Sequence, residues 1–253
     1  MCCTLAYLCW SDSQKNELKP HLKRTWVIGQ VDSRFLAQME QSLWLYALPY
    51  DPAQPVICFD ERPCFLIGDK VEPLALQSGQ VRKQHYAYEK LGSCALLAAI
   101  EPLTGRRLAQ VQQRRTKGEF AHFCQALAAA YPQARQIYLV LDNLNTHNTS
   151  AFYETLPADE AFVLAQRFVF VYTPKAASWL NMIELEFSAL ARLCLDRRIP
   201  TLAQLEAEIL ALLAEREHKR ITFCWQFAIQ SARTKFNAHY QRLHSANEKF
   251  LKT

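Results

Sequence analysis

Ile137-Tyr-Leu-Val-Leu-Asp142-Asn-Leu-Asn-Thr-His147 is the most informative stretch of this 253-residue sequence. Five hydrophobic residues run directly into an acid, which is followed by a turn-forming Asn-Leu-Asn and a histidine. A short, unbroken hydrophobic run rich in β-forming residues predicts a strand buried on both faces, as in the centre of an α/β sheet. Such a strand delivers its last residue to the carboxyl edge of the sheet, where α/β proteins bind ligands. We therefore expect Asp142 to be presented at that edge.

The composition is that of an ordinary folded protein, with 50% hydrophobic residues and only 6 glycines. The length suits one sizeable core, or one domain with a small appendage. No hydrophobic run approaches the roughly 18 residues that a membrane span requires, and the first residues lack the basic region and cleavage site of a signal peptide. We therefore predict a cytoplasmic protein.

The nine cysteines are scattered, without a Cys-x-x-Cys pair or a Cys/His cluster at zinc spacing. This pattern indicates reduced, mostly buried thiols rather than a disulfide framework or a zinc site. The net charge of +5 and the isoelectric point near 8.7 are compatible with a nucleic-acid partner, but many proteins without one have similar values.

Residues 1–46 have a helical pattern. A hydrophobic stripe at 3-to-4 spacing predicts one helix from about Ser33 to Ala47, with Asp32 or Ser33 as its cap. The members of this stripe are Phe35, Met39, Leu43 and Tyr46. The turn-rich residues 49–55 then form a linker.

A second hydrophobic run, residues 56–59, ends in Asp60 and Glu61, and residues 64–68 continue it beyond a bulge expected at Pro63. Residues 93–100 and 107–114 follow after turns. Because short turns join neighbouring strands, we predict three antiparallel strands in series.

Helices and strands alternate in the remainder of the chain. We predict helices near residues 116–131, 150–156, 182–192 and 202–216, strands at 137–141 and 168–172, and an extra turn near 157–160. This order predicts an α/β fold with a mixed β-sheet flanked by helices. The expected division is a helical N-terminal segment (1–48), an α/β domain (49–200) and a helical C-terminal extension packed on that domain (201–253).

Three acids are distinguished by their positions. Asp60 and Asp142 each end a predicted strand, and Glu184 lies one turn into a helix that follows a third strand. Two unit charges about 4 Å apart at an effective dielectric near 20 repel by about 4 kcal/mol, so such a cluster calls for a divalent cation. Oxygen-only ligands favour Mg²⁺ or Mn²⁺ over zinc. Two such ions can activate a water and stabilise the leaving oxygen of a phosphodiester.

The residues around these acids resemble a known family. The blocks Phe59-Asp60-Glu61, Leu139-Val-Leu-Asp142-Asn-Leu-Asn-Thr-His147 and Tyr172-Thr-Pro-Lys-Ala-Ala-Ser178-Trp-Leu-Asn181-Met-Ile-Glu184 are similar to the three acidic blocks of mariner-type DDE transposases. The bacterial insertion-sequence branch is the most similar, and the resemblance runs from Tyr46 to Tyr240. It implies a ribonuclease-H-like fold in which Asp60, Asp142 and Glu184 are catalytic and bind a pair of Mg²⁺ or Mn²⁺ ions.

The resemblance also implies a function and its partners. Family members nick double-stranded DNA at transposon ends and join the freed 3′-hydroxyl to target DNA, as homodimers assembled on the DNA. A bacterial protein associated with the nucleoid is therefore expected. Family members usually begin with paired helix-turn-helix modules, and residues 1–48 resemble at most a remnant of that region. Two rivals stay open, namely a related endonuclease or integrase, and a truncated DNA-binding regulator without catalysis.

Neighbouring acids compete for two of the three positions. Glu184 and Glu186 are about 200° apart around a helix, so they cannot both face the metals, and Asn181 shares the side of Glu184. Asn181 and Glu184 could instead form a capping box. Strand alternation would turn Glu61 to the side opposite Asp60.

A second set of residues is expected either to orient the carboxylates or to contact DNA: Asn143, His147, Lys175, Ser178, Trp179 and Asn181. Lys175 and Trp179 are the strongest candidates for contact with DNA near the metals, whereas His147 could also be a helix cap. Basic residues that would form the DNA surface are Arg82, Lys83, Lys90, Arg106, Arg107, Arg114, Arg115, Lys117, Lys175, Arg197 and Arg198.

Overall fold

The computed structural model describes residues 30–74, 78–79, 83–244 and 247. The helical pattern expected for residues 1–29 and the predicted DNA contact of Arg82 lie outside these residues. Among the described residues, no helix is both long and apolar enough to cross a membrane.

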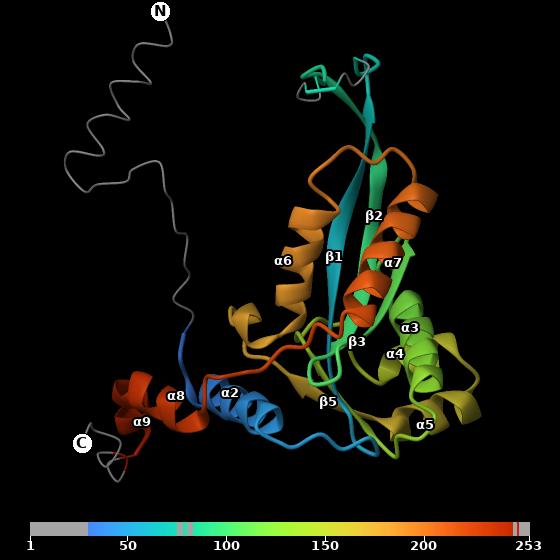
Figure 1. Cartoon of the computed structure of the whole chain (residues 1–253). Helices are drawn as coiled ribbons and strands as arrows, with labels where there is room; N and C mark the ends of the chain where they lie inside the picture. Colours follow the sequence, from blue (N-terminus) through green and yellow to red (C-terminus); the bar gives the residue numbers. More distant parts are fainter. Residues whose placement is uncertain (1–29, 75–77, 80–82, 245–246, 248–253) are drawn as a thin grey trace, which may run out of the picture.

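A five-stranded mixed sheet forms the centre of the molecule (Figure 1), in the order β3-β2-β1-β4-β5. The strands are β1 (Val56–Asp69), β2 (Tyr88–Glu101), β3 (Arg106–Gln112), β4 (Ile137–Leu141) and β5 (Phe168–Tyr172). β1, β2 and β3 are antiparallel neighbours, whereas β1, β4 and β5 run parallel. The sheet confirms the predicted mixed α/β architecture.

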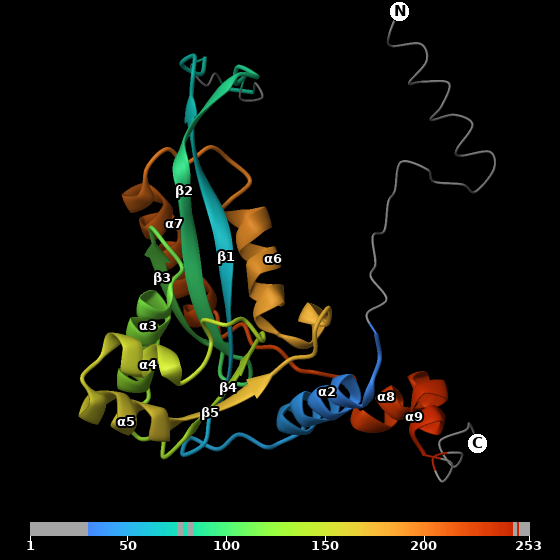
Figure 2. The same cartoon turned by 180° about the vertical axis from the view of Figure 1, so that it is seen from behind.

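Helices cover both faces of this sheet. α6 (Ile183–Leu193) and α7 (Leu202–His218) pack with Cys58 and Val140 in one core. α3 (Lys117–Ala130), α4 (Ser150–Thr155) and α5 (Ala158–Arg167) pack with Ile57, Phe59 and Leu139 in the other. Figures 1 and 2 show helices on both sides of β1 and β2. Alternate residues of each strand therefore enter different cores, as the pleat requires.

The helix predicted from about Ser33 to Ala47 is α2 (Ser33–Tyr46). Asp32 is its cap, because the Asp32 carboxylate accepts a hydrogen bond of 2.7 Å from the Phe35 amide. Thr116 and Glu119 cap α3 reciprocally. The capping side chains, which are recognisable in the sequence, therefore determine where α2 and α3 begin.

β1 differs from the expectation in two ways. It is one continuous strand in which Pro63 pairs with Ala95, and its irregularity lies between Leu66 and Ile67 rather than at Pro63. Asp60 consequently lies within the strand instead of ending it. Parallel pairing with β4 stops at Cys58, so among the described strands β2 alone pairs with the outer half of β1. A strand with one open side tolerates a proline.

The region after α4 also differs, because α5 is a helix of 10 residues where only an extra turn was predicted. Ala161 and Leu164 are its buried residues, three positions apart on one face. A short buried stripe of this kind escapes detection when the surrounding residues are polar.

The last helices, α8 (Ile229–Lys235) and α9 (Asn237–Leu243), lie beside α2 and away from the sheet (Figure 1). Ala232 and Tyr240 pack with Phe35 and Met39 in a separate small core. α7, in contrast, packs on the sheet through residues that include Ile209. The expected domain boundaries stay predictions.

Candidate active site

The three predicted acids line one cavity of about 490 Å³. It opens at the carboxyl ends of the parallel strands, where the sequence placed Asp142. The residues that line it are Asp60, Glu61, Asp142, Asn143, Leu144, Thr173, Pro174, Lys175, Ala176, Ser178, Asn181 and Glu184. We call it the acidic cavity.

Strand register places the two aspartates side by side. β1 and β4 are parallel, with Cys58 opposite Val140. Two residues further along each strand, the same register sets Asp60 opposite Asp142, just beyond the last pair of the ladder. Glu184 joins them from the first turn of α6, which belongs to the same core as Cys58.

The environment of Asp60 disfavours a negative charge. Burial raises the pKa of its carboxyl to about 7, and the charges of Asp142 and Glu184 add to the rise, although a hydrogen bond from the Glu61 amide to Asp60 Oδ1 opposes it. The two other acids are therefore close enough to repel Asp60.

Asp142 is held by a buried histidine. His147 Nδ1 lies 2.6 Å from Asp142 Oδ1, and His147 Nε2 lies 3.3 Å from Glu61 Oε1. Burial lowers the pKa of His147, but the hydrogen bonds to Asp142 and Glu61 outweigh this effect and raise it to about 9. Because His147 is 0% exposed, its side chain is not accessible to DNA, and Thr149 rather than His147 is the N-cap residue of α4. The contacts of both ring nitrogens are those that an orienting role would require.

Glu61 lies on the other side of β1 from Asp60, as alternation predicts, since the neighbouring Phe59 belongs to the core beneath α3. Its position on that side does not remove Glu61 from the site. Glu61 lines the acidic cavity and reaches Asp142 through His147. A glutamate is long enough to approach the edge of a sheet from either face.

Asn181 ties the helix that carries Glu184 to the strand that carries Asp60. Its side chain is buried, donates to the Phe59 carbonyl at 2.8 Å and accepts from the Ile183 amide at 3.4 Å. The alternative capping box of Asn181 with Glu184 is not formed, because Met182 is the N-cap residue of α6 and makes no side-chain cap hydrogen bond. Its buried side chain is therefore not accessible to DNA, and Asn181 is engaged in joining the two elements.

Glu186 is directed away from the acidic cavity. It is 1% exposed and forms ion pairs with Arg107 at 3.1 Å and Arg216 at 2.7 Å. The separation predicted between Glu184 and Glu186 is therefore seen. The same contact corrects the DNA-surface prediction for Arg107, which is buried because it neutralises Glu186.

Three polar residues, Asn143, Lys175 and Ser178, are exposed on the wall of the acidic cavity. Trp179 follows Ser178 and is 45% exposed, but it does not line the cavity. Its ring stacks 6.4 Å from that of Trp225, and the Phe227 ring lies edge-on at 5.9 Å. No local sequence pattern indicates this aromatic group, since Trp225 and Phe227 are 46 and 48 positions away from Trp179.

The donor set of the acidic cavity suits a hard divalent cation. Carboxylate oxygens from three elements face one space, with no His or Cys ligand among its lining residues. In the described part of the chain, no three His, Cys, Asp or Glu side chains are already close enough to enclose an ion. The carboxylates would therefore have to approach one another around a bound cation.

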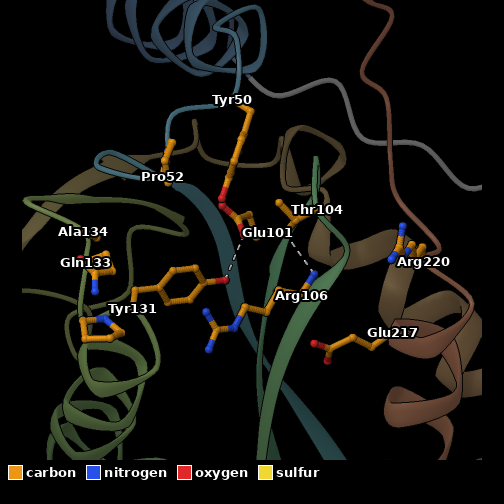
Figure 3. A pocket seen from close by; sticks show the side chains of 11 residues that line it. Tyr50, Pro52, Glu101, Thr104, Arg106, Tyr131, Gln133, Ala134, Glu217 and Arg220 are labelled. Atoms are coloured by element: carbon orange, nitrogen blue, oxygen red, sulfur yellow. Dashed lines mark hydrogen bonds between the residues drawn. The ribbon is translucent and has the colours of Figure 1, made fainter.

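A second cavity, of about 590 Å³, lies near the first residues of β1 (Figure 3). Glu101 is buried at its centre and accepts hydrogen bonds from Thr104 and Tyr131. Arg106 lies over the Tyr131 ring at 4.4 Å. Its lining contains two acids and two arginines, so it has no unbalanced acidic charge that would attract a metal.

Solved structures with a similar fold are transposase complexes. The structure entitled "Mos1 transposase paired-end complex with left transposon end" has a TM-score of 0.53 and 11% identity, over 97% of this chain and 71% of that one. The "Mos1 Strand Transfer Complex" has a TM-score of 0.53 and 12% identity, over 85% and 66%. A "pre-cleavage Mos1 transpososome" has 0.52 and 12%, over 97% and 72%. At such identities the likeness shows the fold alone, which is ribonuclease-H-like.

A search of curated protein sequences found no match. A family model described as "DDE superfamily endonuclease" matches residues 55–206. These residues include the whole sheet, α6 and all the residues that line the acidic cavity. The chain therefore belongs to the DDE superfamily endonuclease family.

Proposed function

We propose that the chain is a DNA transposase that cleaves one strand at transposon ends and joins the freed 3′-hydroxyl to target DNA. Asp60, Asp142 and Glu184 are its catalytic residues and would hold two Mg²⁺ or Mn²⁺ ions. One observation carries the proposal. Three carboxylates from three separate elements line a single open cavity in a chain of the DDE superfamily endonuclease family.

The residues of the cavity have distinct roles in this proposal. One oxygen of Asp60 is engaged by the Glu61 amide, and one oxygen of Asp142 by His147. The other oxygen of each aspartate has no partner among the described residues and is available to a cation. Bound divalent ions would activate the attacking water or hydroxyl and stabilise the leaving oxygen.

Lys175 supplies the cationic group nearest to the acids on the cavity wall. It is exposed, so its ammonium can neutralise a phosphate of the bound strand. Arg114 and Arg115 are exposed as well and extend the proposed DNA surface. Trp179 and Asn143 would contact the same strand.

Double-stranded DNA is the proposed partner, and a homodimer on DNA is the proposed assembly, since two transposon ends need two active sites. The Mos1 structures named above include a complex with a transposon end, which supports DNA as the substrate class. Within the family we assign the chain to the bacterial insertion-sequence branch, which would place it at the nucleoid.

A nicking assay tests the proposal. Supercoiled plasmid is incubated with the full chain and Mn²⁺ or Mg²⁺, and nicked circles are counted on a gel. We expect nicking that EDTA and Asp142→Asn abolish. Asp159→Asn is the matched control, because Asp159 is exposed on α5 and the chemical change is identical.

Four outcomes would overturn the proposal. Metal-independent nicking, or nicking that survives Asp142→Asn, would exclude the acidic cavity as its source. DNA binding without cleavage by the wild type would identify a non-catalytic regulator instead. Cleavage without joining of a labelled 3′-end to plasmid would identify an endonuclease.

A further inference from the structure

Glu61 contacts both aspartates of the acidic cavity by different routes. Its backbone amide donates a 2.7 Å hydrogen bond to Asp60 Oδ1. Its carboxylate lies 3.3 Å from Nε2 of His147, whose Nδ1 lies 2.6 Å from Asp142 Oδ1. Asp60 and Asp142 are thus joined through one residue and one imidazole ring, although they are far apart in sequence.

The imidazole of His147 is confined on every side. The Phe59 ring packs against it edge-on at 5.3 Å, and the Phe120 ring packs against it in a tilted arrangement at 4.9 Å. The His147 carbonyl accepts a 2.7 Å hydrogen bond from the Tyr172 hydroxyl. Because ring and backbone are both fixed, the ring can transmit the position of the Glu61 carboxylate to Asp142.

Glu61 itself is poorly placed to be a ligand. Its side chain is 2% exposed and its Oε1 faces the histidine. It leaves β1 on the side of Phe59, whereas Glu184 belongs to the helix that packs on the side of Cys58. Glu61 is buried, already contacts His147, and leaves β1 on the side opposite Asp60. It therefore acts on the metal site through its neighbours.

We infer that Glu61 is a positioning residue that orients the Asp60 and Asp142 carboxylates for a divalent cation. This inference rests on the proposed function of the same cavity. Removal of residues that orient metal ligands typically lowers metal affinity about 10- to 100-fold. Glu61→Ala should therefore weaken Mn²⁺ binding by about that factor while Asp60, Asp142 and Glu184 are all retained.

The conservative variant separates positioning from ligation. Glu61→Gln keeps a carbonyl oxygen that can accept a hydrogen bond from His147. We therefore expect its Mn²⁺ affinity to stay within about 3-fold of the wild type, a much smaller loss than that expected when an orienting group is removed. If Glu61 were itself a ligand, Gln and Ala would both lose affinity as strongly as Asp60→Asn.

A double-mutant cycle tests whether Glu61 acts through the ring. If it does, Glu61→Ala should have little further effect on Mn²⁺ affinity in a His147→Ala background, because coupled residues are not additive. The measurement is free Mn²⁺ by electron paramagnetic resonance during titration of the full chain. Circular dichroism confirms that each variant is folded, and Glu160→Ala, an exposed acid on α5, is the control.

Unchanged affinity in a folded Glu61→Ala variant overturns the inference, and so do additive effects in the cycle. Absence of Mn²⁺ binding by the wild type overturns the proposed function instead. In that case, crystal structures of the metal-free wild type and of Glu61→Ala test the inference independently of the proposed function. Displacement of the Asp142 carboxylate from its contact with His147 supports it, and an unmoved Asp142 contradicts it.

Discussion

Glu184 and Glu186 are two residues apart on α6, yet Glu184 lines the acidic cavity and Glu186 is buried between Arg107 and Arg216. The helix turns by about 100° per residue, so the two carboxylates face opposite environments. The Glu184 carboxylate lines the acidic cavity, whereas the Glu186 carboxylate joins α6 to β3 and α7. Equivalent substitutions at these two positions should therefore differ strongly in their effect on stability.

Glu186→Gln should destabilise the fold. The substitution leaves two arginines beside a buried neutral group, and breaking a buried pair in this way costs about 3–5 kcal/mol. Glu184→Gln should change stability by less than about 1 kcal/mol, as substitutions without a buried contact do. Urea denaturation of both variants at neutral pH measures the difference, and equal effects would contradict the orientation of α6 described here.

Asp60→Asn should stabilise the protein when metal is removed. Burial and the charges of Asp142 and Glu184 all disfavour the ionised Asp60 carboxyl, and asparagine carries no charge. We expect a gain of about 1 kcal/mol or more, which in a domain of this size raises the melting temperature by about 2–4 °C. Calorimetry with EDTA measures it. A lower melting temperature for Asp60→Asn than for Asp159→Asn would show that Asp60 is not under electrostatic strain.

Asn181→Ala should loosen the start of α6. The substitution removes the donor to the Phe59 carbonyl and the acceptor for the Ile183 amide, and a buried group left without its partner costs about 1–3 kcal/mol. Ser178→Ala, at an exposed position on the same cavity wall, serves as the comparison and should be nearly neutral. Denaturation curves in urea distinguish the two, and a neutral Asn181→Ala would mean that this tie does not stabilise the site.

The contact between α2 and α8 should depend on pH. Hydrogen bonds from Arg233, at 2.7 and 2.9 Å, hold the pKa of Glu40 below its ordinary value. A carboxyl with a lower pKa in the folded state contributes stability above its unfolded pKa, about 4.3, and loses it as the pH falls through the folded value.

Glu40→Gln should therefore be less stable than the wild type at pH 7, by at most about 1 kcal/mol because the pair is partly exposed and screened by solvent. The difference should shrink towards pH 3. Thermal unfolding at both pH values tests this, and a difference that does not change with pH would assign the stability to packing rather than to charge.

Local sequence patterns predicted the elements that depend on neighbouring residues. The strand before Asp142 is recognisable from five hydrophobic residues followed by an acid, and α2 from a stripe with a capping aspartate. The position of Asp60 inside β1 was harder to predict, because Pro63 interrupts the hydrophobic pattern. Beyond Cys58 this strand pairs with β2 but no longer with β4.

Contacts across long separations were not predictable in the same way. His147 and Glu61 are 86 positions apart, and no periodicity reports such a contact. Arg107 is different, since a usable signal was present. It alternates with Ala109 and Val111, and all three are buried on the inner face of β3. A charge in that register predicts a buried partner, which is Glu186.

The order of strands in the sheet has a consequence for synthesis on the ribosome. β1, β2 and β3 pair with their nearest neighbours in sequence, and such hairpins form quickly. β4 must pair with β1 across the whole of β2, β3 and α3, and α6 emerges later still. A nascent chain therefore displays Asp60 on its first hairpin before the other two acids have left the exit tunnel, and it cannot close the acidic cavity until α6 has also emerged.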